Sequence, residues 1–285
     1  MTAPDDLGPC LATLIPNPFA ADAAAILSGL DAAVENGCGG VSAWSLHVTN
    51  LDPDPGVFAR EVAERGFEVW VVEAATGWAA ADGIDRDGDF TLDLAEALGA
   101  HQVVAVMLEP APADSDRAVV GFADLCDRAA ERDISVALEF LPWTGIPDLQ
   151  TAWRLIAAAG RPNGGILLDT WHWQRQPGGP CPEFLAGLPG SAIQVVQLCD
   201  AAEVPGDDPM TEAMASRPLP GEGVVDFAAL ASVMEGIGAT PLLCPEVFNR
   251  DLVAAGPSTF ARSVVDACCS AWPSGRRPSH PGGGR

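Results

Sequence analysis

The 285-residue chain contains no lysine, so all 15 of its basic residues are arginine. Without a lysine amine, neither Schiff-base catalysis nor a lysine-bearing phosphate loop is available to this protein. Its 39 acidic residues give a formal net charge of -24. A protein that binds duplex nucleic acid needs a basic face to neutralise phosphates, so this charge disfavours a nucleic-acid partner.

Two further patterns are missing from the sequence. The eight cysteines show no Cys-x-x-Cys spacing, which favours small buried apolar side chains in a reducing compartment over a metal knuckle or a disulfide framework. No apolar stretch reaches the ~18 residues that a membrane span requires, and no secretory leader precedes the first apolar run. We therefore expect a soluble, cytoplasmic protein with no membrane partner.

Short apolar runs alternate with helical patterns throughout the chain. With 48% hydrophobic residues, a chain of this length buries one large core. The runs are too short for helices and are typical of strands buried on both faces. They cover residues 10–14, 40–48, 68–74, 102–107, 135–139, 165–169, 193–197 and 241–246. The helical patterns between and after them cover residues 20–35, 57–65, 90–98, 116–131, 149–159, 182–188, 226–236 and 258–271.

Eight strand–helix alternations predict an α/β fold, specifically a (β/α)8 TIM barrel. Glycines that follow helical patterns mark left-handed helix ends at Gly66, Gly99, Gly160 and Gly238. Residues 1–272 are predicted to form this single domain. Residues 273–285 are rich in proline and glycine and are predicted to be a disordered tail.

The last four runs each end in a carboxylate or a carboxamide. These residues are Glu139, Asp169, Gln197 and Glu246. Parallel α/β folds place their chemistry at the carboxyl ends of strands, so the four side chains are predicted to converge at the mouth of the barrel. The alternative is that each is an isolated carboxylate or amide at a strand end.

Three carboxylates within reach of one another repel strongly and need a counter-charge. In a chain without lysine, a divalent cation is the simplest one. Three carboxylates and an amide form an all-oxygen ligand set, which suits Mn²⁺ or Mg²⁺, with Zn²⁺ and Co²⁺ as the alternatives. The sequence therefore predicts a metal site formed by the residues named above.

The strings around these residues resemble a known family. They are Leu138-Glu-Phe140, Leu168-Asp-Thr-Trp-His172, Val196-Gln-Leu-Cys-Asp200 and Cys244-Pro-Glu246. Together they are similar to the sugar phosphate isomerase/epimerase group of xylose-isomerase-like TIM barrels, in the AP-endonuclease-2-type superfamily. That group includes ketose 3-epimerases, inosose dehydratases and endonuclease-IV-like proteins. The resemblance is specific from about Glu139 to Glu246 and only topological before that region.

The resemblance implies a role for each matching residue. Glu139, Asp169, Gln197 and Glu246 would bind one divalent metal ion, and the two glutamates would also act as an acid/base pair. His172 and Arg217 resemble residues that contact the substrate. Most members of the family have histidine where this chain has Gln197, so the ligand set is a variant one.

The leading functional prediction is a metal-dependent isomerase or epimerase of a sugar-like or cyclitol-like hydroxy-carbonyl compound. Glu139 and Glu246 would move a proton through an enediolate, and a bound cation would stabilise its charge. The alternative is a lyase or dehydratase of a keto-sugar, a keto-cyclitol or a glycoside on the same scaffold. An endonuclease-IV-like enzyme is disfavoured by the charge and by the presence of only four histidines. A barrel that binds a metabolite without turnover also stays open, as does assembly into a homo-oligomer.

Aromatic and basic residues complete the predicted site. Trp143 would form a roof over the pocket, and the number of tryptophans near strand ends predicts an apolar mouth. His172 could instead pack between aromatic rings, and Arg217 could instead be an exposed charge on a lid. His47 is predicted to be structural. The long loop over residues 201–223 follows the seventh run, and loops of that length are commonly functional or mobile.

Overall fold

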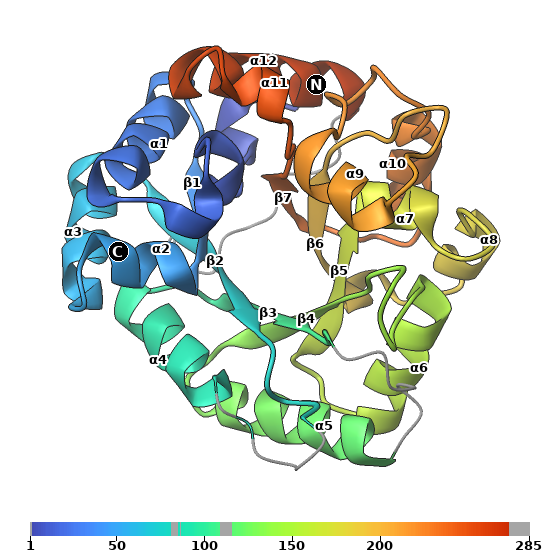
Figure 1. Ribbon diagram of the computed structural model, residues 1–285. Helices are drawn as coiled ribbons and strands as arrows, with labels where there is room; N and C mark the ends of the chain where they lie inside the picture. The colour runs from blue at the N-terminus through green and yellow to red at the C-terminus, as the bar shows by residue number, and fades with distance from the viewer. Residues whose placement is uncertain (1, 81–84, 86, 109–115, 274–285) are drawn as a thin grey trace.

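The computed structural model describes residues 2–80, 85, 87–108 and 116–273. Parallel strands form a nearly closed barrel with helices around it (Figure 1). Within these residues seven strands pair in sequence order: β1 (Gly40–Trp44), β2 (Glu68–Ala75), β3 (Gln102–Val106), β4 (Ser135–Glu139), β5 (Gly164–Asp169), β6 (Ile193–Leu198) and β7 (Leu242–Pro245). The predicted TIM barrel is confirmed.

An N-terminal segment closes the barrel between β7 and β1. Leu7 forms a parallel bridge with Leu243, and Cys10 forms one with Ser42. The prediction of a first strand over residues 10–14 is wrong, because Leu11–Leu14 is a 3-10 helix. Residues 11–14 are all buried. A run that is apolar on every side has no periodicity to distinguish a strand from a helical turn.

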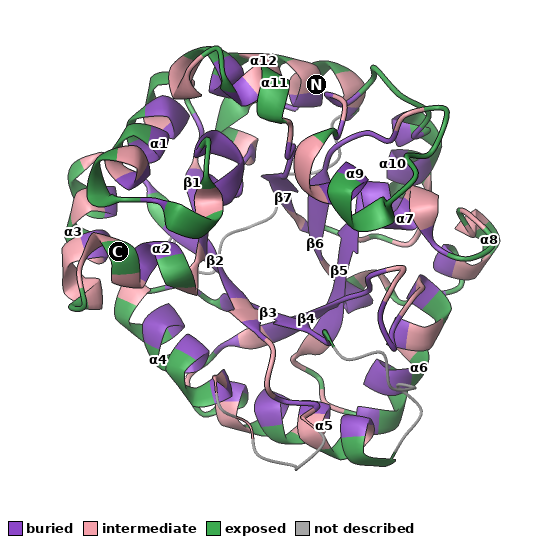
Figure 2. Cartoon of the chain, in the orientation of Figure 1, coloured by how far each residue is buried: buried purple, intermediate pink, exposed green. Residues whose placement is uncertain are grey.

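Helices surround the strands and cover their outer surface. They are α1 (Ala23–Glu35), α2 (Ser45–Leu51), α3 (Pro55–Glu64), α4 (Gly88–Leu98), α5 (Asp116–Ala130), α6 (Leu149–Ala159), α7 (Thr170–Arg175), α8 (Pro182–Leu185), α9 (Pro209–Ala215), α10 (Phe227–Gly236), α11 (Arg250–Val253) and α12 (Pro257–Ala271). Short 3-10 turns lie at Pro4–Asp6, Pro18–Ala20 and Gly190–Ala192. Figure 2 shows buried residues along the strands and exposed residues on the outer sides of the helices.

The predicted helix positions agree with those in the structure to within a few residues, and α6 has the predicted bounds. The four glycines predicted to end helices all have positive φ: Gly66, Gly99, Gly160 and Gly238. Four helices were not expected, namely α2, α7, α9 and α11. The predicted strand over residues 40–48 ends at Trp44 and continues as α2, and the long loop after β6 contains α9. The predicted disordered tail lies outside the described residues, apart from Pro273.

Two layers of apolar side chains form the core. The larger one fills the space between the strands and the helices. The smaller one lies inside the barrel and includes Val71, Ala137, Leu167, Val195 and Cys244. Near the N-terminal ends of the strands, the Trp70 ring lies so close to Gly8 that a Cβ atom built there would be 2.3 Å from it. The barrel therefore closes against a large indole, and only glycine leaves it room.

All eight cysteines are free thiols, and six of them are buried. This agrees with their interpretation as small apolar side chains. Within the described residues, no helix combines the length and the apolar character needed to cross a membrane.

Candidate active site

The polar residues of the barrel mouth share the inner face of the strands with apolar residues below them. Side chains two positions apart along a strand point to the same face. Each polar residue lies two positions after a residue of the inner core. The pairs are Val71 and Glu73, Ala137 and Glu139, Leu167 and Asp169, Val195 and Gln197, and Cys244 and Glu246. The structure thus brings the four predicted residues together, and it adds Glu73.

Glu139 ends β4 and faces His172. His172 Nε2 lies 3.4 Å from Glu139 Oε1, which is the one ion-pair contact of this carboxylate among the described residues. His172 is 2% exposed, and its Nδ1 atom is buried with no hydrogen-bond partner in the part of the chain described. Trp143 and Trp171 hold the imidazole by edge-on contacts, with ring centroids 5.4 and 5.3 Å away. His172 is therefore fixed in place with one ring nitrogen still available.

Asp169 has both a structural role and a place in the site. It ends β5 and caps α7, because its Oδ1 accepts a hydrogen bond of 2.9 Å from the His172 backbone N–H. This cap begins the short helix that carries His172. The other oxygen, Oδ2, accepts a hydrogen bond of 2.7 Å from Arg217 Nη1. Burial acts to raise the pKa of Asp169, but Arg217 and His172 outweigh it and lower the pKa, so the carboxylate is ionised.

Arg217 lies inside the protein and joins two of the carboxylates. It is 2% exposed, so the alternative of an exposed charge on a lid is wrong. Its Nη1 atom contacts Asp169 Oδ2 at 2.7 Å and Glu246 Oε2 at 3.2 Å. The prediction that a divalent cation is the simplest counter-charge is therefore incomplete. The Arg217 guanidinium neutralises part of the cluster, whereas the sequence predicted for it only a contact with the substrate.

Gln197 lies between Glu246 and Glu73. Its Nε2 atom donates to Glu246 Oε1 at 3.1 Å and reaches Glu73 Oε2 at 3.5 Å. Its Oε1 atom is buried and accepts no hydrogen bond from the described residues. An unpaired buried acceptor is costly and is usually explained by a missing water or ion. The amide oxygen of Gln197 is thus free to act as a metal ligand.

Glu73 was not predicted from the sequence, although its side chain lies on the same inner face as those of its neighbours. It lies within β2, two positions before the end of the strand, so the pattern of a polar residue that ends an apolar run does not identify it. Its carboxylate accepts a hydrogen bond from the Ser42 hydroxyl, and Gln197 Nε2 lies 3.5 Å from its Oε2 atom. Burial raises the pKa of Glu73, the Ser42 hydrogen bond opposes this, and repulsion from Glu139 and Asp169 adds to it, so that the pKa is about 7. Burial and then repulsion from Glu73 raise the pKa of Glu246 as well.

Carboxylates outnumber cations in this cluster. Glu73, Glu139, Asp169 and Glu246 are all at most 9% exposed, and Arg217 is the permanent cation among them. Two groups of residues could each hold a metal ion, because the ligand atoms inside each group all lie within 4.8 Å of one another. One group is Glu139, Asp169 and His172, and the other is Cys10, Glu73 and Glu246. This excess of acidic groups, with the His172 nitrogen and the Cys10 sulfur beside them, fits a divalent cation.

The long loop after β6 is anchored to the same side of the mouth. Glu212 on α9 accepts hydrogen bonds from Trp171 Nε1 at 3.1 Å and from Arg175 Nη2 at 2.7 Å. Arg217 follows α9 and donates from Nε to the Ala213 carbonyl at 2.6 Å. Because Trp171 and Arg175 belong to α7, the loop and the helix of His172 form one packed unit.

His47 is structural, as predicted. It is fully buried, and its Nε2 atom lies 2.9 Å from the Pro18 carbonyl oxygen.

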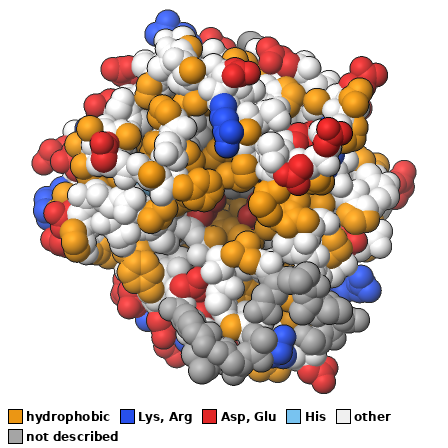
Figure 3. Space-filling model, in the orientation of Figure 1, with side chains coloured by type: hydrophobic (Ala, Val, Ile, Leu, Met, Phe, Trp, Pro, Cys, Tyr) orange, Lys and Arg blue, Asp and Glu red, His pale blue; other side chains and the backbone are white. Residues whose placement is uncertain are grey.

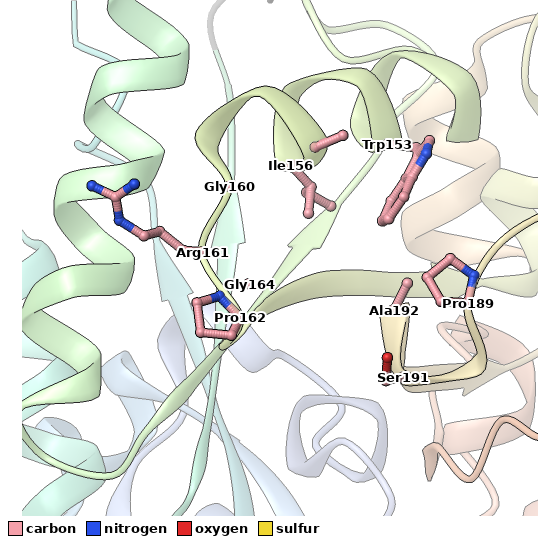
Figure 4. Close-up of a pocket in the computed structure, with 10 residues that line it drawn as sticks. Trp153, Ile156, Gly160, Arg161, Pro162, Gly164, Pro189, Ser191 and Ala192 are labelled. Atoms are coloured by element: carbon pink, nitrogen blue, oxygen red, sulfur yellow. The ribbon is translucent and has the colours of Figure 1, made fainter.

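A separate hollow lies at the opposite end of the barrel, between the end of α6 and the start of β6 (Figure 4). Its cation, Arg161, is paired with Asp127 at 2.6 Å. The N-terminal face of such barrels serves stability rather than chemistry, so we assign no reaction to this hollow.

Comparison with known proteins gives consistent results. A family model described as xylose isomerase-like TIM barrel matches residues 30–265. A 3-dehydroshikimate dehydratase of Pseudomonas aeruginosa is 27% identical over 237 residues, which are 79% of this chain and 36% of that protein. An inosose isomerase of Bacillus velezensis is 26% identical over 152 residues, which are 52% of each chain. This chain thus spans about a third to a half of the length of these relatives.

Solved structures show the same fold. The IOLI protein, whose crystal structure contains a bound zinc atom, superimposes with a TM-score of 0.78. The match covers 93% of this chain and 96% of that one at 18% identity. The shared architecture therefore extends over nearly the whole of both proteins.

Proposed function

The chain belongs to the xylose isomerase-like TIM barrel family, and from this premise we propose that it is a metal-dependent lyase that dehydrates a hydroxylated cyclic ketone. The reaction would remove a proton from the carbon next to the ketone and expel a hydroxyl group from the following carbon. The single observation that carries the proposal is the difference in bonding between Glu246 and Glu139.

Both carboxylate oxygens of Glu246 are engaged within the protein. Oε1 accepts from Gln197 at 3.1 Å, and Oε2 contacts Arg217 at 3.2 Å. The Glu139 carboxylate contacts only the imidazole of His172 at 3.4 Å among the described ion-pairing groups. Glu246 is therefore suited to a holding role, whereas Glu139 and His172 form an adjacent pair that can exchange protons with a substrate.

Glu139, Asp169, Gln197 and Glu246 would hold the cation. Manganese or magnesium suits this set of oxygen ligands, and zinc or cobalt is the alternative. When bound, a divalent cation would polarise the substrate ketone and stabilise the negative charge that develops on its oxygen.

The protein's own groups account for the proton transfers. Glu139 takes the proton from the α-carbon, and the electron pair of the C–H bond becomes part of a new carbon–carbon double bond. The β-carbon–oxygen bond breaks, and His172 gives a proton to the departing hydroxyl, which leaves as water. Trp143 and Trp171 position His172 by edge-on contacts and exclude bulk water from it.

A ring ketone of the shikimate type is the favoured substrate. The relative that matches 79% of this chain is a 3-dehydroshikimate dehydratase. The tryptophans beside His172 also suit a flat ring better than an extended, phosphorylated sugar.

Isomerisation or epimerisation of a cyclitol-like or sugar-like ketone is the second candidate. It is supported by the match to an inosose isomerase. In this reaction one of Glu139 and Glu246 would remove a proton from the carbon next to the carbonyl, which leaves an enediolate. The other would return a proton to the opposite face, or to the adjacent carbon. The ion pair of Glu246 with Arg217 is the observation against it.

The test uses purified protein loaded with Mn²⁺ and a panel of hydroxylated cyclic ketones that includes 3-dehydroshikimate and an inosose, in deuterated water. Loss of one water, detected by mass spectrometry, is the expected result. Glu139→Gln should lower the rate by about 100-fold or more because it removes the base. His172→Gln should lower the rate of dehydration more than the rate at which the α-proton exchanges with solvent deuterium. The reason is that it removes the acid that protonates the departing hydroxyl and leaves the base in place.

Glu131→Gln is the matched control, since Glu131 is an exposed glutamate just after α5. It should behave like the unmodified protein. Deuterium incorporation into a product of unchanged composition would select the isomerase instead. Metal-loaded protein that neither exchanges nor dehydrates any member of the panel would contradict both reactions.

A further inference from the structure

A wall of aromatic rings rises from the carboxylate cluster on the side opposite Trp143. Trp44, the last residue of β1, lies with its ring centroid 5.4 Å from that of Phe19 and 5.8 Å from that of Phe248. We call Phe19, Trp44 and Phe248 the aromatic wall. Figure 3 shows hydrophobic side chains gathered around a central hollow that has acidic side chains within it.

The aromatic wall is continuous with the candidate active site. Trp44 lies directly opposite Glu73 in the register of the β1–β2 pair. Phe248 lies two residues after Glu246, and the Arg217 guanidinium carbon is 5.3 Å from the Phe248 ring centroid. A ligand with its polar part among the carboxylates would therefore place the rest of its structure beside these rings.

The outer end of the wall is exposed yet held in place. Phe19 is 65% exposed, which is unusual for a large aromatic ring. The 3-10 turn that carries it is tied to α2 by His47 Nε2, 2.9 Å from the Pro18 carbonyl, and by Asn50 Nδ2, 3.2 Å from the Ala21 carbonyl. His47 also stacks on Trp44, with an interplanar angle of 8°. An apolar surface that is rigid and open before binding favours affinity, because little conformational entropy remains to be lost.

We propose that the aromatic wall is a second binding subsite, which accepts a flat aromatic substituent on the substrate. The inference rests on the proposed function and narrows its substrate class to hydroxylated ring compounds that carry an aryl group. A bare polyol ring would leave this surface without an apolar partner, and Arg217, which lies over Phe248, is already paired with Asp169 and Glu246. A planar group can stack on Trp44 and cover Phe19.

Binding and turnover are measured separately. Isothermal titration calorimetry compares phenyl β-D-glucopyranoside with methyl β-D-glucopyranoside, two unreactive ring alcohols that differ in the aryl group. The phenyl compound should bind about tenfold or more tightly, as expected for burial of one ring. Phe19→Ala should remove most of that preference while leaving the methyl compound unaffected.

Phe90→Ala is the matched control, because Phe90 is 48% exposed on α4 and belongs to no part of the site. It should preserve the preference. Equal affinity for the two glycosides, or a preference that survives Phe19→Ala, would overturn the subsite. The subsite would also be overturned if Phe19→Ala changed the self-association of the protein, measured by sedimentation, and left the affinity for both glycosides unchanged. The aromatic wall would then be an interface between copies of the chain.

The two proposals fail in different ways. A phenyl preference that depends on Phe19, without turnover of any cyclic ketone, would overturn the lyase and keep the subsite. Dehydration of an unsubstituted ring ketone, with no phenyl preference, would overturn the subsite and keep the lyase.

Discussion

Arg217 shows how much of this site depends on a single buried cation. Its guanidinium lies 2.7 Å from Asp169 and 3.2 Å from Glu246, and both acids are at most 5% exposed. Removing one member of a buried ion pair leaves an uncompensated charge in a medium of low dielectric constant.

Replacing this arginine tests that dependence. Arg217→Met should lower the free energy of unfolding by about 3–5 kcal/mol in the presence of a chelator. Urea denaturation followed by circular dichroism measures this loss, and Mn²⁺ should restore part of it if the cation binds the folded state. Arg161→Met is the control, because its pair with Asp127 lies at the surface, where solvent screens the charges and the pair contributes little to stability. Equal losses for the two variants would contradict the buried role.

Glu73 makes stability depend on pH in a predictable direction. Burial raises its pKa in the folded protein to about 7 from an ordinary 4.5, so the folded state holds this proton more tightly than the unfolded state does. Its contribution to stability is therefore complete below about pH 4.5 and is lost as the pH rises through about 7. The groups that face it are Glu139, Asp169, Glu246 and Cys10.

Melting temperatures of chelator-treated protein should fall between about pH 5 and pH 8, and Glu73→Gln should flatten this slope. Differential scanning calorimetry at a series of pH values measures it. Glu68→Gln at the exposed start of the same strand is the control and should keep the slope of the unmodified protein. If Glu73→Gln leaves the dependence of melting temperature on pH unchanged, a group other than Glu73 is responsible for it.

At the scale of secondary structure, α7 and α9 act together. Asp169 begins α7, and Glu212 on α9 accepts hydrogen bonds from two side chains of that helix. Glu212 also accepts from the Gly206 backbone N–H at 2.7 Å, which holds the start of the loop. One buried carboxylate thereby fixes a segment of about a dozen residues that would otherwise be a long surface loop.

Glu212→Gln should loosen this segment, because an amide cannot accept as many hydrogen bonds and carries no charge for Arg175. Hydrogen exchange measured by mass spectrometry should be faster over residues 203–216, corresponding to a local loss of about 1–3 kcal/mol. The strands should be unaffected. Glu222→Gln, an exposed glutamate further along the same loop, is the control. Unchanged exchange over these residues would mean that packing alone holds α9.

For the whole molecule, closure of the barrel depends on the segment Leu7–Cys10. Its backbone bonds to β7 through Gly8 N–H and the Leu243 carbonyl at 2.9 Å, and to β1 through the Ser42 N–H and the Pro9 carbonyl at 3.0 Å. Trp70 lies against Gly8 at the bottom of the barrel. The N-terminal residues therefore complete the cylinder that holds the rim residues together.

Gly8→Ala should strain this closure, because the new methyl group would overlap the Trp70 ring. We expect a loss of about 1–3 kcal/mol in urea denaturation. The double variant Gly8→Ala/Trp70→Phe should recover part of the loss relative to Trp70→Phe alone, since the smaller ring leaves room. Gly236→Ala is a control, as open space surrounds its position. If the losses in free energy of unfolding simply add in the double variant, the overlap with the Trp70 ring is not the cause of the destabilisation.

The barrel and most of its rim follow from local patterns in the sequence. Alternation of apolar runs and helical patterns is a local property, and so is a polar residue that ends a buried strand, as at Glu139, Asp169, Gln197 and Glu246. The rule does not identify Glu73, because β2 continues past it to Ala75. Helices with a weak or short pattern, such as α2 and α9, could not be separated from the strand or loop around them.

The contacts between these residues depend on the folded arrangement of the whole chain. Arg217 reaches Asp169 across 48 positions of the chain, and Glu73 meets Gln197 across 124. Phe19, Trp44 and Phe248 form one wall because the two ends of the chain meet where the barrel closes. Such contacts depend on strand register and closure, which are set by the packing of the whole core rather than by local sequence. The same packing removes water from the rim, so that charges spread along the chain come to share one buried site.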